Sequence, residues 1–161
     1  MEGVASLFGK QVLREVDENG LFDKITEIRK KFGDRAFLRA MHFFEENKRV
    51  EKEVTALKNK NFDAFKKNVI ESGQSSYMYN QNVYPAFDVC NQSVSVALCI
   101  AEKILKDKGA WRVHGGGFAG TMQAFVPNEL LDIYLTEMKK VFGENSCYVL
   151  SIRPYGGIKV L

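Results

Sequence analysis

Apolar positions recur every three or four residues over much of the first 105 residues, which is the spacing of amphipathic helices. These stripes predict helices over residues 21–32, 34–58, 62–73 and 94–105. Residue types that favour helix ends stand between them, namely Asp34 and Asn61 as N-caps and Gly33, Gly73 and Gly109 as stops. Residues 1–20 are mixed in character and are expected to be a lead-in segment.

Strand-like patterns replace the helical stripes after residue 109. Short β-prone runs predict strands over residues 110–114, 121–126, 147–152 and 158–161, with a helix from Asn128 to about Phe142 before the third strand. Segment 74–91 is rich in Ser, Asn, Gln and Tyr, so we expect an ordered loop, which either carries binding groups or folds over its own tyrosines. Helices on one face of a small antiparallel sheet make an α+β domain, expected as one domain over residues 1–161.

Composition narrows the classes of function. The chain has 161 residues and a formal net charge of +3. Its lysines are spread along helical stretches, which argues against a nucleic-acid-binding surface. Three cysteines without metal-binding spacing indicate a reducing compartment. No apolar run has the length of a signal peptide core or a membrane span, so we expect a cytoplasmic protein without membrane contact.

A glycine-rich turn links the first two predicted strands. Its sequence, Gly115-Gly116-Gly117-Phe118-Ala119-Gly120, has the letters of a dinucleotide-binding fingerprint. That fingerprint must open into a helix that receives the pyrophosphate, whereas here the following residues alternate like a strand and end at Pro127. The glycines exceed what a hairpin needs, which suggests that a phosphate, or a backbone that holds one, packs against the turn. A bulged hairpin without a ligand is the alternative.

Three stretches resemble the GHMP kinases, the family of galactokinase, homoserine kinase and mevalonate kinase. The stretch from Arg112 to Gly120 is similar to the third motif of the family, and its arginine and phenylalanine look like the galactokinase branch. The stretch from His42 to Val50 resembles the galactokinase pattern of His, Glu-Asn and Arg-Val on a long helix. Glu71-Ser72-Gly73-Gln74-Ser75-Ser76 more loosely resembles a Glu-Ser-His-x-Ser segment. The resemblance extends from about Gly33 to the C-terminus.

This resemblance implies the ferredoxin-like C-terminal lobe of a two-lobed kinase that transfers the γ-phosphate of ATP to a monosaccharide, with galactose as the leading candidate. In the family, the N-terminal lobe carries the phosphate loop and the catalytic carboxylate and arginine. No run here resembles its Pro-x-Gly-x-Gly-Leu-Ser-Ser loop. We therefore expect no catalytic residue and no metal ligand on this chain, and no activity from it alone. ATP and magnesium would belong to the complete enzyme, with neither held tightly by this chain.

The resemblance also implies partners and contact residues. The expected partners are an N-terminal lobe and the monosaccharide, and an exposed lobe-docking face would also favour a homodimer. The family's glycine turn packs under the phosphate loop, so His114 and Gly115 to Gly120 are the candidates for cofactor contact, with Phe118 against the other lobe. A stand-alone binding or regulatory module of the same fold is the alternative function.

For several side chains the sequence allows two structural or functional roles. His114 is expected either to donate to a phosphate oxygen or to bond across the strands. Arg112 is expected to pair with a carboxylate such as Glu46 rather than to reach into the cleft, and His42 to be a core or capping residue. The galactokinase pattern has other residues at Ala119, His114 and Gly73.

Overall fold

The computed structural model describes residues 1–118, 120–152, 154–156 and 159. Its α-helices are α1 Glu2–Ser6, α2 Asn19–Asp23, α3 Ile25–Phe32, α4 Asp34–Lys58, α5 Phe62–Ser75, α6 Ser93–Leu105 and α7 Leu131–Phe142. Strands β1 Ala110–His114 and β2 Thr121–Phe125 pair in an antiparallel sheet. Short 3-10 turns occupy Leu13–Glu15, Asn128–Leu130 and Glu144–Ser146, and a π-helical segment occupies Ser76–Asn80. The chain is therefore an α+β protein, as the sequence predicted.

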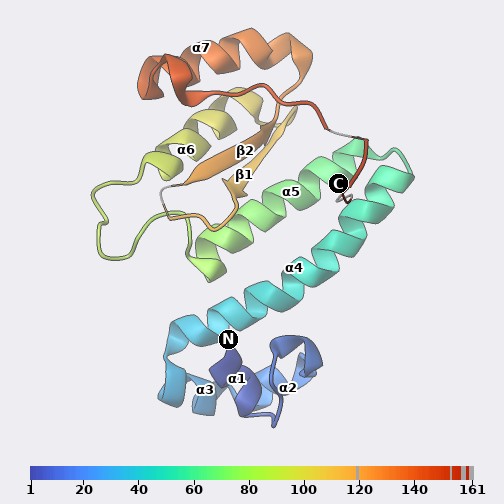
Figure 1. Cartoon of the computed structure of the whole chain (residues 1–161), viewed down its shortest axis with the longest axis vertical. Coiled ribbons are helices and arrows are strands. Elements are labelled where there is room, and N and C mark those ends of the chain that lie inside the picture. The colour runs from blue at the N-terminus through green and yellow to red at the C-terminus, as the bar shows by residue number, and fades with distance from the viewer. Residues whose placement is uncertain (119, 153, 157–158, 160–161) are drawn as a thin grey trace.

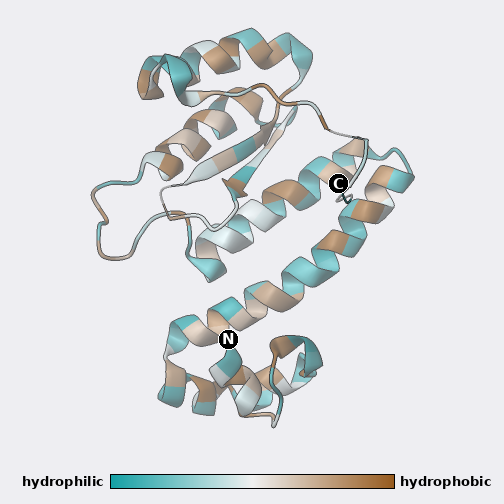
Figure 2. Ribbon diagram, in the orientation of Figure 1, coloured by the Kyte–Doolittle hydropathy of each residue, from teal (hydrophilic) through white to brown (hydrophobic). Residues whose placement is uncertain are grey.

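The 25-residue helix α4 runs from the N-terminal helices to the corner where α5 begins (Figure 1). The short helices α1 to α3 pack around the first turns of α4, and α5 runs back along its second half. The sheet lies between α5 and the pair α6 and α7, so helices flank it on both sides, whereas the sequence predicted helices on one face only. Figure 2 shows the consequence for composition: α6, which is covered by the sheet and α7, is more hydrophobic than α4.

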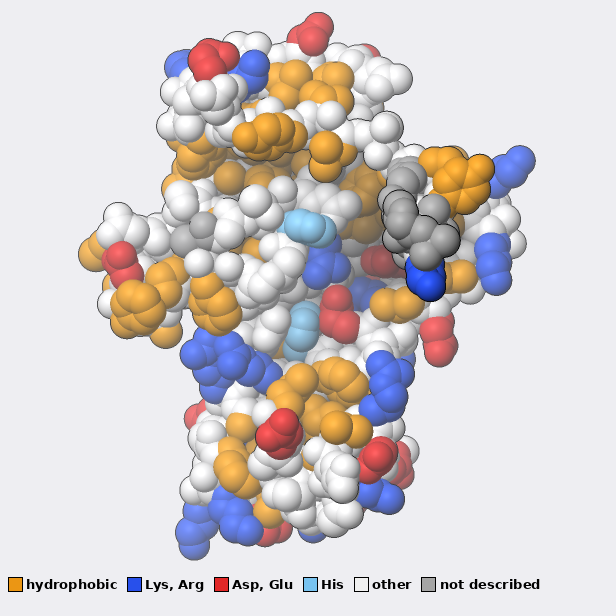
Figure 3. Space-filling view, viewed as in Figure 1, with side chains coloured by type: hydrophobic (Ala, Val, Ile, Leu, Met, Phe, Trp, Pro, Cys, Tyr) orange, Lys and Arg blue, Asp and Glu red, His pale blue; other side chains and the backbone are white. Residues whose placement is uncertain are grey.

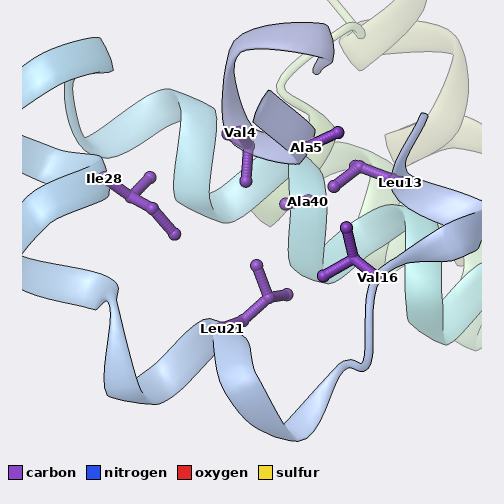
Figure 4. Packing of buried hydrophobic residues seen from close by; sticks show 7 residues of the cluster. All are labelled: Val4, Ala5, Leu13, Val16, Leu21, Ile28 and Ala40. Atoms are coloured by element: carbon purple, nitrogen blue, oxygen red, sulfur yellow. The ribbon is translucent and has the colours of Figure 1, made fainter. Parts of the chain in front are cut away.

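The N-terminal 20 residues take part in a hydrophobic core and are not only a lead-in segment. Side chains from α1, from the 3-10 turn and its flanks, and from α2, α3 and α4 meet in one cluster (Figure 4): Val4, Ala5, Leu13, Val16, Leu21, Ile28 and Ala40. The periodicity of apolar residues did not indicate this core, because short helices carry too few turns to show a clear period.

The predicted hairpin is confirmed. β1 and β2 pair in register from Ala110 opposite Phe125 to His114 opposite Thr121. Trp111 and the β2 residues Met122 and Ala124 pack against the buried side chains of α6 and α7. Trp111 is thus partly buried against this core.

The predicted helix over residues 21–32 is wrong in one respect, because Lys24 divides it. The backbone of Lys24 leaves the helical region, with φ −103° and ψ 11°, and its ammonium group donates a hydrogen bond to the Leu7 carbonyl oxygen. Leu21 of α2 and Ile28 of α3 are seven residues apart and still reach the same core cluster.

Gly73 does not end α5, and the loop predicted over 74–91 is correspondingly shorter. α5 continues to Ser75 and the π-helical segment extends the helical path to Asn80. The polar residues of this stretch do not place it on the surface, because Ser75 and Ser76 are both buried and Ser75 contacts His42. The non-helical loop begins at Gln81, whose φ is 55°.

The strand predicted over residues 147–152 is also wrong. These residues lie in an extended segment without a strand assignment, and its side chains Tyr148, Val149, Leu150 and Ile152 are 64–87% exposed. A β-prone sequence becomes a strand only where another strand supplies hydrogen-bond partners. Of the strand predicted over 158–161, only residue 159 lies within the described residues.

Candidate functional site

The three stretches that resemble galactokinase meet at Glu46. Ser72 of α5 donates a hydrogen bond of 2.6 Å from its hydroxyl to Glu46 Oε2. Arg112 of β1 places its Nη1 3.6 Å from the same oxygen, and Arg49, one turn further along α4, pairs with Oε1. The predicted pairing of Arg112 with Glu46 is confirmed. With both carboxylate oxygens engaged, Glu46 serves to tie α4, α5 and β1 together and is poorly suited to accept a proton from a substrate.

His42 lies one turn before Glu46 on the same side of α4. Its Nδ1 is 2.9 Å from the hydroxyl oxygen of Ser75, so the histidine continues the contact between α4 and α5. Burial lowers the pKa of His42, Glu46 opposes that shift, and the positive charges of Arg49 and Arg112 add to it. The surroundings of His42 therefore disfavour its charged form, and its contact with Ser75 makes it a hydrogen-bonding residue of the helix interface, in line with the expected core or capping role.

Glu53 extends this group of charges along α4. Burial raises the pKa of its carboxyl group, and the Glu46 carboxylate adds to the shift, whereas Arg112 and Arg49 oppose it. Figure 3 shows both histidines on one face of the molecule, with acidic and basic side chains between them. The charged groups of the site thus gather where α4, α5 and the sheet come together.

Gly73 explains how α5 approaches β1 so closely. A Cβ at this position would lie 3.0 Å from Cβ of Arg112 and 3.2 Å from the carbonyl oxygen of Trp111. These distances are shorter than ordinary van der Waals contacts, so any side chain would push the helix away from the strand. The glycine therefore permits the approach that brings Ser72 and Arg112 to the same carboxylate.

The glycine turn is held by a residue that the sequence analysis missed. The amide N–H of Phe118 donates a hydrogen bond of 2.7 Å to the carbonyl oxygen of Asn82, and Asn82 Nδ2 donates one of 3.3 Å to the carbonyl oxygen of Gly116. Asn82 is only 5% exposed. Gly117 has φ +78°, and a Cβ built there would overlap the Asn82 carbonyl oxygen. A backbone does pack against the turn, and it belongs to this chain.

The remaining turn residues are arranged differently. A Cβ on Gly115 or Gly116 would have no atom within 4 Å, although Gly115 has φ +65°. His114 is exposed at the end of β1, opposite Thr121, and Phe118 is 46% exposed with φ 54°. Gly120 sits near the Gly117 carbonyl oxygen, and Ala119 lies outside the described residues. The described part of the turn therefore has an anchored side at Gly117 and an open side at Gly115 and Gly116.

A cleft of about 380 Å³ opens between α5, α6 and β1. Tyr77, Met78 and Trp111 give it an apolar lining, and Arg112 and Glu102 contribute charged groups. It shares Arg112 and Gly73 with the contact around Glu46. Within the described residues, no group of three or more His, Cys, Asp or Glu side chains is placed to hold a metal ion.

Comparison with known proteins finds galactokinases among the relatives of this chain. No protein-family model matches the chain. A galactokinase of Glaesserella parasuis is 28% identical to it over 144 residues, which are 89% of this chain and 34% of that protein. Galactokinases of Mannheimia succiniciproducens and Haemophilus influenzae are 27% and 26% identical over the same shares.

The chain is similar to a region of galactokinases. The resemblance expected from the three motifs is thereby confirmed. The chain spans about a third of the length of these relatives. None of the helices in the described ranges combines the length and the apolar character needed to cross a bilayer.

Proposed function

We propose that this chain is the C-terminal, ferredoxin-like lobe of a two-lobed sugar kinase of the GHMP family. The complete enzyme would transfer the γ-phosphate of ATP to a hydroxyl group of a monosaccharide in the cytoplasm, with galactose as the first candidate. One observation carries the proposal: Glu46, Ser72 and Arg112 come from three separate stretches that resemble galactokinase, and they join in one hydrogen-bonded and ion-paired contact. Chance similarity in three stretches gives no reason for such convergence.

The proposal assigns chemistry to the other lobe and positioning to this one. Phosphoryl transfer depends on groups that orient the phosphates and stabilise the charge that develops on them. The described residues of this chain contribute the anchored turn and the tie around Glu46 instead. In the complete enzyme, ATP and magnesium would bind chiefly to the N-terminal lobe, and the turn from His114 to Gly120 would support their binding loop.

Exposed apolar side chains support the proposal that another protein lobe binds this chain. Phe118 at the turn is 46% exposed, and the segment with Leu150 and Ile152 exposes 87% of each of these two side chains. Exposed apolar patches commonly mark a surface that another protein covers. Phe118 would contribute to such a surface at the turn, and Leu150 and Ile152 to one at the C-terminal segment. We propose that an N-terminal lobe covers the turn, and that self-association into a homodimer would replace it when that lobe is absent.

The cleft between α5 and α6 favours a second candidate function, a stand-alone binding or regulatory module. Its volume of about 380 Å³ and its mixture of aromatic and charged lining groups are typical of small-molecule sites. Such a module would bind its ligand without any second lobe. The two candidates therefore differ in what the chain does by itself.

Isothermal titration of the chain with Mg-ATP and with galactose separates them, alongside a coupled assay of ADP release. The kinase-lobe proposal predicts neither binding at micromolar concentration nor turnover. Micromolar binding of either compound that is lost in Tyr77→Ser, which alters the cleft wall at a side chain that is 42% exposed, would favour the binding module instead.

A further inference from the structure

Two arginines of α4 reach toward the segment that leads into Asn82. Arg35 donates a hydrogen bond of 2.8 Å from Nη2 to the carbonyl oxygen of Gln81, and Arg39 donates one of 3.1 Å from Nε to the carbonyl oxygen of Asn80. The two arginines are four residues apart, so they lie one above the other on the same side of the helix. Both side chains are partly buried.

Their positive charges have no carboxylate partner within the described ranges, although other arginines of the helices have one. Arg29 pairs with Asp34, and Arg49 pairs with Glu46. Burial lowers the pKa of Arg39, and the neighbouring Arg35 lowers it further. Two guanidinium groups side by side and partly shielded from water are unfavourable unless an anion compensates them.

Two buried hydrogen-bonding groups without partners belong to Arg35 and to the residue that follows Gln81. Arg35 Nε is buried without a hydrogen-bond partner, and so is Asn82 Oδ1 on the segment that the arginines contact. A guanidinium group has five N–H donors, of which each arginine uses one in its hydrogen bond to a carbonyl oxygen. Buried polar atoms without partners are uncommon and call for a ligand or an ordered water. The two arginines therefore offer several N–H donors, and Asn82 Oδ1 offers one acceptor.

We propose that Arg35 and Arg39 form a binding site for a phosphate group beside segment 80–82. The planar guanidinium fork matches the oxygens of phosphate in geometry as well as charge. Phosphate is compact enough to reach a partly buried donor, and its protonated form also has an O–H for an acceptor such as Asn82 Oδ1. Asn82 also anchors the glycine turn, so phosphate bound beside Asn82 would stabilise the conformation of that turn. The site does not depend on the chain being a kinase lobe.

Titration with inorganic phosphate at constant ionic strength tests the site, with sodium chloride as the reference salt. The readouts are the Nε–H signals of the arginines by NMR and the melting temperature. We expect saturable binding in the millimolar range, and at least about tenfold weaker binding in Arg35→Gln and in Arg39→Gln. Arg29→Gln is the matched control, because it removes the same charge from an exposed arginine of α3 and should leave phosphate binding unchanged.

Several results of these titrations would overturn the phosphate site. Absence of saturation, or equal losses in Arg29→Gln and Arg39→Gln, would overturn the site. If Arg39→Gln fails to fold by circular dichroism, Arg39→Lys keeps the charge and loses the fork, and we expect intermediate weakening from it. Unchanged binding in the lysine variant would also count against the site. Repeating the titration with galactose 1-phosphate distinguishes a sugar phosphate, which would bind more tightly, from free phosphate as the ligand.

Discussion

The carbonyl oxygen of Asn82 occupies the space where a side chain on Gly117 would have to be. The same oxygen accepts the hydrogen bond from the Phe118 amide, so the loop after the π-helical segment and the glycine turn share one anchor. The glycine at 117 is therefore required by the chain's own packing. A ligand or partner lobe at the turn can therefore not approach Gly117 on the side of Asn82, whereas Gly115, Gly116 and the exposed Phe118 remain open to it.

Gly117→Val should destabilise the protein. The substitution combines a positive φ that valine disfavours with an overlap at Asn82, so we expect a loss of about 2 kcal/mol or more in the free energy of unfolding. Urea denaturation measures it. Gly116→Ala is the matched control, because a Cβ there meets no atom within 4 Å, and it should unfold at the same urea concentration as the unmodified chain. Equal effects of the two changes would show that Asn82 does not anchor the turn.

Restoring the galactokinase-like histidine at position 73 should also be harmful. Gly73→His places a side chain against Arg112 Cβ and the Trp111 carbonyl oxygen, and α5 must then move away from β1. We expect a loss of about 1–3 kcal/mol in stability, measured by urea denaturation. Gly73→Ala should show a smaller loss in the same direction. A stabilised histidine variant would mean that α5 and β1 are not packed as described.

Neutralising Glu46 should lower the free energy of unfolding far more than neutralising its neighbour Glu45. Glu46→Gln leaves Arg49 and Arg112 without their shared carboxylate and weakens the bond from Ser72, with an expected loss of about 2 kcal/mol. Glu45→Gln, which removes only a pair with the exposed Lys48, should lose less than about 0.5 kcal/mol. Thermal melts of both variants give the comparison. Similar losses would remove Glu46 from its role as the tie between α4, α5 and β1.

Acidification should weaken the fold through His42. Its pKa is lowered in the folded state, so below about pH 6.5 the unfolded chain takes up a proton that the folded chain resists. Stability should therefore fall as the pH drops from about 6.5 toward the folded-state pKa. The contribution of Glu53 to the change of stability with pH has the opposite sign. Its raised pKa favours proton uptake by the folded state as the pH falls toward about 4.3, and this uptake stabilises the fold.

The variant His42→Gln separates the two contributions. It should lose the decline in urea midpoint between pH 7 and about pH 5.5 while the change due to Glu53 at lower pH persists. An NMR titration of the His42 ring should give a midpoint below its ordinary value. A midpoint above that value would reverse the sign of the effect and contradict the described environment.

Local signals in the sequence were reliable only in part. Asp34, which was predicted as an N-cap, is the first residue of α4 after Gly33 and makes no capping hydrogen bond; its carboxylate accepts a hydrogen bond from Arg29 Nε instead. Asn61 caps α5 as expected, because its side chain accepts a hydrogen bond from the Ala64 amide. The hairpin and the pairing of Arg112 with Glu46 were also foreseen. Glycine has two uses, ending a helix or allowing close packing, and the sequence alone could not show that Gly73 has the second.

Long-range contacts set the limit elsewhere. Asn82 is a single asparagine in a polar stretch, and only the excess of glycines in the turn indicated that some backbone must approach it. The same limit applies to Leu150, whose β-prone segment finds no strand partner within the described ranges. Strand formation depends on a neighbour that may be distant in sequence, or on another molecule, and neither leaves a local pattern.

The central claim is that this chain supplies the non-catalytic lobe of a sugar kinase. Galactose-dependent release of ADP from Mg-ATP tests it most directly, measured for the chain alone and for the chain combined with the N-terminal two thirds of the Haemophilus influenzae galactokinase. We predict no turnover from either part alone and turnover from the mixture, abolished by Gly117→Val in this chain. Steady, galactose-dependent turnover by the purified chain alone would contradict the claim.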